Sequence, residues 1–286
     1  MATVRLSIVT YCKGRLEHLK RALPTFVEQS ESEVIVVDYD CPDRTKDWVA
    51  AHFPTVRVAL VTDAPIFNLS RARNVGARLA RAPWLAFCDA DNLLPPSFVS
   101  ELLPQMVPGS YLRTLRNTPF GPKKKWIPLI CEAAAFWAVG GYDDAIRGWG
   151  PEDQELIDRL DRSGIKEGHG TAALVETLPH NDAVRSTYYE QTIDVSGVIS
   201  NFYAKIKRRY FETRSQWFTD SQRYSTYRAV EQAVLASLAE LENDAIFDIR
   251  IAESTPPWTA RLTARAIRDY HGSGQGLIPP HGPRAK

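Results

Sequence analysis

Hydrophobic and polar positions alternate in blocks along the first third of the chain. Four apolar runs predict buried strands: Val4–Thr10, Val34–Asp38, Val56–Val61 and Trp84–Cys88. Between them, apolar residues recur at helical spacing in three segments: Arg15–Glu28, Thr45–Ala51 and Ser70–Ala80. This β-α-β-α-β-α-β order is typical of an α/β fold with a mostly parallel central sheet flanked by helices.

Polar residues follow three of these predicted strands. They are Thr10-Tyr11-Cys12, Asp38-Tyr39-Asp40 and Asp89-Ala90-Asp91. Because the carboxyl ends of parallel strands border the ligand crevice in such sheets, we expect these three groups to lie near one another.

The pattern changes after the first third. Residues 105–150 are rich in Pro, Gly and aromatic residues, which predicts irregular structure, and Pro151–Arg162 predicts a helix that Gly164 ends. Three further helices are expected at Ser196–Thr213, Tyr224–Glu242 and Thr259–Tyr270. We therefore expect a domain over residues 1–193 and a helical extension over residues 194–286, with a mobile tail from Gly272.

Composition narrows the class of protein. The 286 residues carry 35 Lys and Arg against 34 Asp and Glu, a net charge of +1, and 44% are hydrophobic, which excludes a disordered chain. This balance gives no reason to expect a nucleic-acid partner. The four cysteines are far apart and form no CxxC pair, which favours a reducing compartment. Without a leader-like start or an apolar run of about 20 residues, we expect a cytoplasmic protein without a transmembrane segment.

Asp89-Ala90-Asp91 is the first candidate for chemistry. Two carboxylates there follow a buried strand and precede the helix start at Pro95-Pro96-Ser97. Carboxylates are the hard oxygen ligands that hold Mg²⁺ or Mn²⁺ on a diphosphate. The alternative is that they only end the strand and cap the helix.

Gly148-Trp149-Gly150-Pro151-Glu152-Asp153 is the second candidate. Glycines let a backbone approach a ligand closely, and Trp149 offers a flat apolar face to a sugar ring. Glu152 and Asp153 lie in the first turn of the predicted helix, where carboxylates also complement the helix dipole. An ionised carboxylate at this place can serve as a base for a hydroxyl group.

Three ordered motifs carry a family resemblance. Phe136–Asp144, which leads into Gly148–Asp153, resembles GT-A glycosyltransferases, family 2-like enzymes and the GWGxED segment of the galactosyltransferase and N-acetylgalactosaminyltransferase C-terminal domain. Asn68–Gly76 is similar to the ARNxG helix of the same enzymes, and its Asn74 stands 15 residues before Asp89. The resemblance covers residues 4–182 and implies the GT-A fold.

The resemblance implies a set of donor contacts: Thr10, Tyr11, Asp38, Asp40, Arg71, Arg73, Asn74, Asp89, Ala90, Trp149 and Gly150. Within it, Asp38 would accept hydrogen bonds from a uracil or a ribose, although Asp38–Pro42 departs from the common VDDGS pattern. Arg71 and Arg73 would face the diphosphate or form a solvated helix face, and Asn74 would fix a loop or contact the donor.

The resemblance also implies a metal site. The ligands would be Asp89, Asp91 and His180, the last standing 27 residues after Asp153, with His169 as a competing candidate. The cofactor would be Mn²⁺ or Mg²⁺.

The expected activity is the metal-dependent, inverting transfer of a hexose or N-acetylhexosamine from a UDP-sugar to a hydroxyl acceptor. Asp153 would be the base and Glu152 would orient hydroxyl groups. The acceptor would be a saccharide or a lipid-linked hydroxyl, in glycan or polysaccharide biosynthesis, and Ser196–Thr213 would pack in the core or contact the inner face of the membrane. A silent nucleotide-sugar-binding or scaffold protein is one alternative. A pyrophosphorylase is another, but the segment after the first strand holds only Gly14 for a phosphate loop.

Overall fold

The computed structural model describes residues 3–116, 123–168, 175–179, 187–239 and 245–272. Two compact units are present, one formed by Met1–Tyr142 with Asp153–Tyr188 and the other by Asp143–Glu152 with Tyr189–Lys286. Residues expected in a mobile tail lie outside the described residues from 273 onward.

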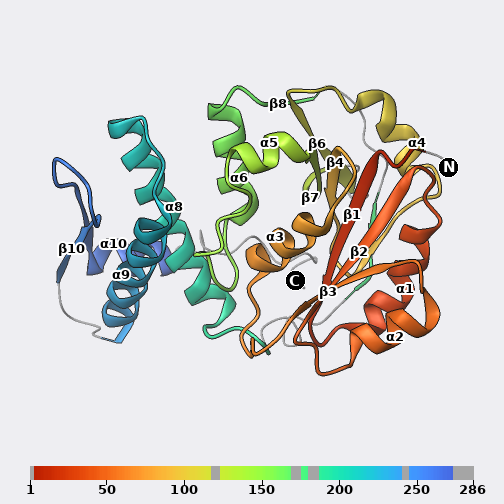
Figure 1. The fold of residues 1–286 in the computed structure, drawn as a ribbon. Coiled ribbons are helices and arrows are strands. Elements are labelled where there is room, and N and C mark those ends of the chain that lie inside the picture. The colour runs from red at the N-terminus through yellow and green to blue at the C-terminus, as the bar shows by residue number, and fades with distance from the viewer. Residues whose placement is uncertain (1–2, 117–122, 169–174, 180–186, 240–244, 273–286) are drawn as a thin grey trace, which may run out of the picture. The chain divides into compact units, whose positions relative to one another are not determined.

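A seven-stranded sheet in the order β3-β2-β1-β4-β7-β6-β8 forms the centre of the first unit (Figure 1). Its strands are β1 (Leu6–Cys12), β2 (Ser32–Tyr39), β3 (Arg57–Val61), β4 (Trp84–Phe87), β6 (Ser110–Arg116), β7 (Lys123–Glu132) and β8 (Lys166–Glu167). The first four pair in parallel, whereas β7 is antiparallel to both β4 and β6. This confirms the α/β prediction of a mostly parallel sheet.

Helices cover both faces of this sheet. They are α1 (Leu16–Val27), α2 (Thr45–His52), α3 (Leu69–Leu79), α4 (Phe98–Leu102) with the 3-10 turn η1 (Leu103–Gln105), α5 (Ala133–Ala138) and α6 (Glu152–Arg162). The apolar residues of α1, α2 and α4 share one buried cluster, and those of α3, α5 and α6 line the clusters of the opposite face. This division follows from the helical spacing of their apolar positions.

Two predictions about secondary structure were wrong. Residues 105–150 contain β6, β7 and α5, although their Pro, Gly and aromatic content predicted irregular structure. Thr259–Tyr270 was expected to be one helix, but its first residues form β11 (Thr259–Thr263), which pairs with β10 (Ile246–Arg250) before α10 (Ala264–Gly272) begins. For β6, β7 and β11, strand pairing overrides local propensity.

The second unit is built on two long helices, α8 (Ile193–Arg214) and α9 (Asp220–Ala239), with the β10-β11 hairpin and α10. Its core includes Ala145 and Ile146 of the segment 143–152. Fully buried Asp143 ties this segment to both helices, because its carboxylate pairs with Lys207 Nζ at 2.5 Å and with Arg223 Nη1 at 3.1 Å. The sequence alone did not identify Lys207 or Arg223 as the partners of Asp143.

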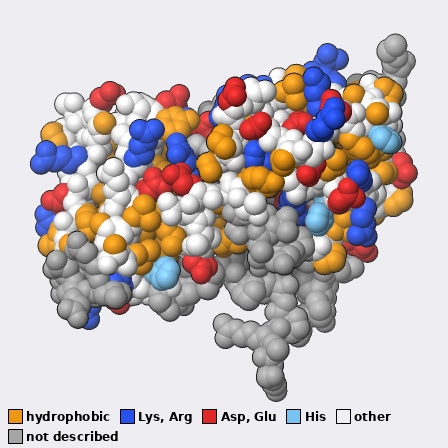
Figure 2. All heavy atoms as spheres, turned by 90° about the horizontal axis from the view of Figure 1, so that it is seen from below, with side chains coloured by type: hydrophobic (Ala, Val, Ile, Leu, Met, Phe, Trp, Pro, Cys, Tyr) orange, Lys and Arg blue, Asp and Glu red, His pale blue; other side chains and the backbone are white. Residues whose placement is uncertain are grey.

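Charges of both signs are mixed on the molecular surface. On the face that Figure 2 shows, described Lys and Arg side chains are interspersed with Asp and Glu. Within the part of the chain that the structure describes, no helix combines the length and the apolar composition that a membrane crossing requires.

Candidate active site

Helix α3 brings a buried arginine to the end of the parallel sheet. The helix begins after Asn68, whose side chain accepts the N–H of Arg71 at 2.9 Å. Gly76 lets α3 lie close to β1 and β2, because a Cβ at this position would collide with Val9. Arg73, on the same helix, is 1% exposed. A guanidinium cannot shed its charge, so this burial requires acceptors around it.

Four residues surround Arg73, and we call the five together the Arg73 cluster: Tyr11, Arg73, Asp89, Tyr142 and Asp153. Arg73 Nε donates to Tyr11 Oη at 3.0 Å, and Nη1 donates to Asp153 Oδ1 at 2.9 Å. Nη2 lies 3.8 Å from Asp89 Oδ1, which also accepts a hydrogen bond from Tyr11 Oη. The structure thus brings together four residues that the sequence analysis singled out, from β1, α3, the end of β4 and α6.

Tyr142 is the fifth member, and Asn74 fixes its backbone. Asn74 Nδ2 donates to the Tyr142 carbonyl at 2.8 Å, while the Tyr142 N–H donates to Asn74 Oδ1 at 2.9 Å. Gly141 has φ +69°, and a Cβ there would stand 2.7 Å from Asn74 Oδ1. A glycine at position 141 is therefore required for this close fit. Asn74 accordingly fixes a loop, which is one of its two expected roles.

Asp153 receives two hydrogen bonds on one oxygen. Oδ1 accepts from Arg73 Nη1 at 2.9 Å and from Tyr142 Oη at 3.0 Å. Among the described residues, Oδ2 has no partner, and the side chain keeps 14% of its surface exposed. Burial raises the pKa of Asp153, while the charge of Arg73 and the Tyr142 hydroxyl oppose that rise. The free oxygen can accept a proton from a bound hydroxyl group.

Asp89 and Asp91 differ in their surroundings. Asp89 has 28% of its side chain exposed, and its Oδ2 is without a partner among the described residues. Asp91 is buried, and its Oδ2 pairs with Arg15 Nη2 at 2.9 Å. The Arg73 cluster itself holds the carboxylates of Asp89 and Asp153 and the guanidinium of Arg73, so its charged groups sum to a negative charge. A hard cation bound by one or two carboxylates and by donor phosphates fits this arrangement.

His180 and His169 lie outside the described residues. In the described ranges, no group of three or more His, Cys, Asp and Glu side chains could hold a metal ion. A cation here would thus take two carboxylates at most from the described residues and the rest of its ligands from elsewhere.

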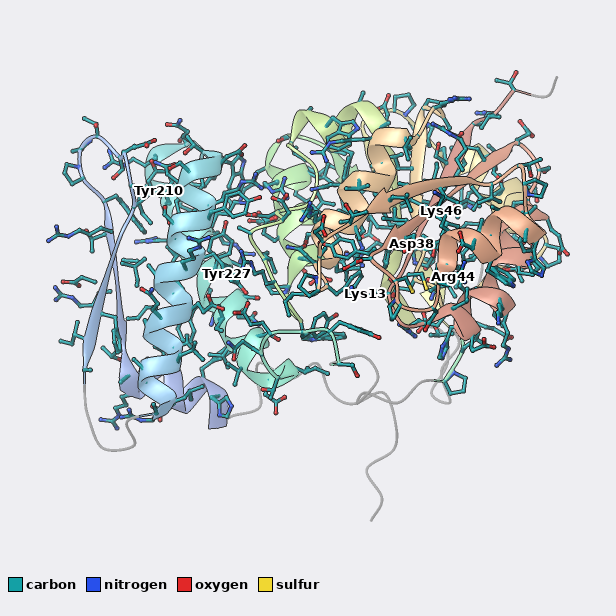
Figure 3. All side chains as sticks on the ribbon, turned by 60° about the horizontal axis from the view of Figure 1, so that its bottom comes forward. Lys13, Asp38, Arg44, Lys46, Tyr210 and Tyr227 are labelled. Carbon is teal, nitrogen blue, oxygen red and sulfur yellow. The ribbon has the colours of Figure 1, made fainter. Side chains whose placement is uncertain are left out.

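Three nucleotide candidates stand at the ends of β1 and β2. Thr10 is fully buried, and its hydroxyl has no hydrogen-bond partner among the described residues. Asp38 accepts the N–H of Cys41 at 2.9 Å and that of Lys46 at 2.7 Å, so its carboxylate orders the turn into α2 (Figure 3). Asp40 accepts the N–H of Ala64 at 3.1 Å.

Lys13 and Arg15 are polar residues of the same region that sequence reasoning missed. Lys13 Nζ donates to the carbonyls of Tyr39, Asp40 and Ala64 at 3.2, 2.8 and 2.9 Å. It therefore joins the loops after β1, β2 and β3. Buried Lys is rare unless it is paired, so a Lys directly after a buried strand was the available signal for this role.

Two other candidates lie away from the Arg73 cluster. Arg71 is exposed, because residues two apart on a helix point to different sides, and its backbone N–H donates to the Asn68 side chain. Ala90 is 2% exposed and packs in the core beneath the sheet end.

Trp149, Gly150 and Glu152 belong to the second unit. The two glycines of this segment face α8: a Cβ on Gly148 would stand 2.7 Å from Ser196 Cβ, and one on Gly150 would stand 2.6 Å from Ser200 Cβ. Ser196 Oγ accepts the Trp149 N–H at 3.0 Å. Helix packing thus accounts for both glycines, which the sequence analysis had attributed to the approach of a ligand. Trp149 is half-buried and Glu152 is buried.

Two protein-family models match the chain in succession. The model of glycosyl transferase family 2 matches residues 7–126, and a model described as the N-terminal domain of galactosyltransferase matches residues 129–190. The first range contains Asp89 and Asp91, and the second contains Tyr142 and Asp153.

Curated relatives and solved structures agree with these matches. A validoxylamine A glucosyltransferase of Streptomyces hygroscopicus subsp. jinggangensis is 28% identical over 219 residues, covering 56% of this chain and 52% of the relative. The chain spans about half the length of the curated relatives it matches. A mannosyltransferase of Pyrobaculum calidifontis, solved with GDP-Man and Mn²⁺, superposes with a TM-score of 0.50 at 16% identity, covering 98% of this chain and 82% of the other. S. aureus TarS superposes with a TM-score of 0.51 at 13% identity, covering 80% and 71%.

Proposed function

The chain belongs to the family 2-like glycosyltransferases with the GT-A fold, and on this premise we propose that it transfers a hexose or N-acetylhexosamine from a UDP-sugar to a hydroxyl acceptor with inversion. The observation that carries the proposal is the state of Asp153. Its Oδ1 is held by two donors, its Oδ2 has no partner among the described residues, and its side chain is 14% exposed. A positioned carboxylate with one free oxygen is what a general base requires.

The proposed step is a single displacement. Asp153 Oδ2 takes the proton of the acceptor hydroxyl as the acceptor oxygen attacks the anomeric carbon. The bond between that carbon and the diphosphate oxygen breaks on the opposite face, and the nucleoside diphosphate leaves with the electron pair. Attack and departure on opposite faces invert the anomeric configuration. Glu152, the preceding residue, is proposed to orient the hydroxyl groups of a bound sugar.

Asp89 and Asp91 are the proposed metal ligands, with His180 as the proposed third. A bound Mn²⁺ or Mg²⁺ would offset the negative charge that develops on the leaving diphosphate. Arg73 contributes positive charge from the chain itself, since its guanidinium lies between the carboxylates of Asp89 and Asp153. Arg15, paired with Asp91, holds that carboxylate at the end of the sheet.

The donor is proposed to bind over the ends of β1 and β2, where Thr10, Tyr11, Asp38 and Asp40 are the proposed contacts to the nucleotide. UDP is the proposed nucleotide, and Trp149 is proposed to stack on a sugar ring. The proposed acceptor is a saccharide or a lipid-linked hydroxyl in glycan or polysaccharide biosynthesis. A reducing, cytoplasmic location is proposed because the four cysteines are free thiols.

Release of nucleoside diphosphate from a panel of UDP-, GDP- and dTDP-sugars tests this proposal. We expect one donor to be turned over in Mn²⁺ or Mg²⁺, activity to be lost in EDTA and restored by added metal, and Asp91→Ala to fold but remain inactive. GDP-sugars are included because GDP-Man is present in the Pyrobaculum structure. Undiminished turnover in EDTA would exclude the metal, and binding of a donor without turnover would instead indicate a silent binding protein.

A separate test concerns His180, the proposed third metal ligand. His180→Ala should raise the metal concentration that gives half of the full activity, because a lost ligand weakens metal binding. An unchanged metal titration would assign the third ligand to another residue, with His169→Ala as the matched comparison.

A further inference from the structure

We propose that Cys12 and Cys41 form a redox-active dithiol, which a peroxide converts into a disulfide that joins the ends of β1 and β2. The two Sγ atoms lie 3.9 Å apart. Both thiols are free in this structure. This modification site does not depend on the chemistry of the Arg73 cluster.

The sheet topology brings the two residues together. β1 and β2 are parallel neighbours, and Cys12 at the end of β1 stands opposite Asp38 of β2. Asp40 has φ +48°, which turns the chain after β2, and the Asp38 carboxylate accepts the N–H of Cys41 at 2.9 Å. These contacts hold the two sulfurs in van der Waals contact. A disulfide bond is about 2.05 Å long, so the two Sγ atoms must move closer by about 1.9 Å to form one.

The two sulfurs have different environments. Cys41 is half-buried, and its Sγ accepts the N–H of Gly14 at 3.1 Å. Hydrogen bonding from the Cys12 thiol lowers the pKa of Cys41 to about 6, and the Gly14 N–H adds to this effect against partial burial. Cys12 is 1% exposed, and its pKa is raised well above the usual value by the same thiol pair and by burial. Cys41 is therefore the thiolate that meets an oxidant, and Cys12 is the thiol that resolves the product.

The reaction balances with a peroxide as the oxidant. The Cys41 thiolate attacks one peroxide oxygen, the O–O bond breaks, and the leaving hydroxide takes a proton to become water. Cys41 is then a sulfenic acid. Cys12 Sγ loses its proton and attacks Cys41 Sγ, the S–O bond breaks, and a second water leaves. Two thiols and one hydrogen peroxide thus give one disulfide and two waters, with two electrons passing from sulfur to oxygen.

The other two cysteines provide an internal comparison. Cys88 and Cys131 are both fully buried, and burial is the main cause that raises the pKa of each thiol, to about 12 for Cys131. Buried neutral thiols react slowly with peroxides. We therefore expect oxidation to be confined to the Cys12–Cys41 pair.

The disulfide would change the ends of both strands. Cys41 Sγ would give up the N–H of Gly14, and the loops after β1 and β2 would be joined covalently. Thr10, Tyr11 and Asp38 lie at these strand ends, so oxidation should weaken nucleotide binding. This last consequence rests on the proposed function, whereas the disulfide itself does not.

Mass spectrometry of the full chain after treatment with hydrogen peroxide tests the proposal. We expect loss of the mass of two hydrogens, a peptide pair joining Cys12 to Cys41 in a non-reducing digest, and full reversal by dithiothreitol. Cys88 and Cys131 should take up iodoacetamide only after unfolding. Oxidation of Cys41 to a sulfinic acid with Cys12 still free, or no oxidation at a peroxide dose that oxidises reduced glutathione, would overturn it.

Variants separate the two steps. Cys12→Ser should stop at a sulfenic acid on Cys41 that dimedone traps, Cys41→Ser should leave Cys12 reduced, and the control Cys131→Ala should still form the disulfide. Dimedone labelling of Cys12 in the Cys41→Ser protein would contradict the assigned order.

UDP affinity supplies the functional arm. Calorimetric titration should show at least a several-fold weaker affinity for UDP in the oxidised protein, with recovery in dithiothreitol. A complete disulfide with unchanged UDP affinity would overturn the link to the nucleotide. Failure of the reduced protein to bind any nucleoside diphosphate would instead count against the proposed function, while the mass measurement would still decide the disulfide.

Discussion

Asp153 receives hydrogen bonds from two donors on one oxygen, Oδ1. Tyr142 supplies one of them from a fully buried ring that packs edge-on against Phe87. Tyr142→Phe keeps the ring and removes the donor, so the pKa of Asp153 should rise further and the acid limb of the kcat–pH profile should move to higher pH. A hydrogen bond to a charged group is worth about 1.5–3 kcal/mol, so turnover near neutral pH should fall by roughly 10- to 100-fold.

Tyr203→Phe is the matched control for this prediction. Tyr203 is also fully buried and donates to the carboxylate of Asp143 at 2.7 Å, but in the second unit. Tyr203→Phe should lower the free energy of unfolding by about as much as Tyr142→Phe does, because each variant removes one buried hydrogen bond to a carboxylate. It should leave the acid limb of the kcat–pH profile where it is. If the two variants moved the profile equally, or neither moved it, Tyr142 would have only a structural role.

The candidate site was predicted from the sequence in part. Tyr11, Arg73, Asp89 and Asp153 were all named from motifs, because each is a polar residue beside a buried strand or within a recognisable run. Their pairing was not predictable, since Arg73 and Asp153 meet across 80 residues of sequence. Tyr142 was missed because a buried aromatic residue after Gly-Gly has the ordinary appearance of a core residue.

At the scale of elements, the contact between α8 and the segment 143–152 makes a sharp prediction. An added Cβ on Gly150 would stand 2.6 Å from Ser200 Cβ and 3.3 Å from Ile146 Cγ2. Gly150→Ala should therefore lower the free energy of unfolding by about 1–3 kcal/mol, as overpacking does in a close-packed interior. Urea unfolding of the purified protein measures this change.

Ser200→Gly removes the atom that the new Cβ would meet. In a double-mutant cycle, Gly150→Ala with Ser200→Gly should recover most of the loss, after allowing about 1 kcal/mol for glycine in a helix. Ser237, a buried serine of α9, provides the control, because Ser237→Gly should add to Gly150→Ala without coupling. Equal coupling with both serines would argue against a direct contact between Gly150 and α8.

The parallel half of the sheet was predictable because its strands are continuous apolar runs separated by amphipathic helices. β7 was not, because it begins with Lys123, contains Pro128 and pairs antiparallel with β4 far back in the sequence. β11 was merged with α10 for a related reason. Its residues are compatible with a helix, and only the hairpin with β10 makes them a strand.

At the scale of the whole molecule, the chain passes from the first unit to the second and back within eleven residues that end at the candidate base. Tyr142 and Asp153 belong to the first unit, and the intervening Asp143–Glu152 belongs to the second. The ion pairs of Asp143 with α8 and α9 therefore stabilise a segment whose two neighbours in the chain, Tyr142 and Asp153, belong to the Arg73 cluster. The sequence indicated two regions, but it did not indicate that one region contributes a loop to the other.

The central claim of this account is that Asp153 removes the acceptor proton, and the initial rate of nucleoside diphosphate release by Asp153→Asn tests it most directly. Asparagine keeps the size of the side chain and an oxygen for Arg73, but it cannot act as a base. With Asp158→Asn on the same helix as the matched control, the rate should fall by roughly 10²-fold or more for Asp153→Asn, with donor affinity nearly unchanged, and stay near wild type for the control. A near-normal rate for Asp153→Asn would contradict the assignment.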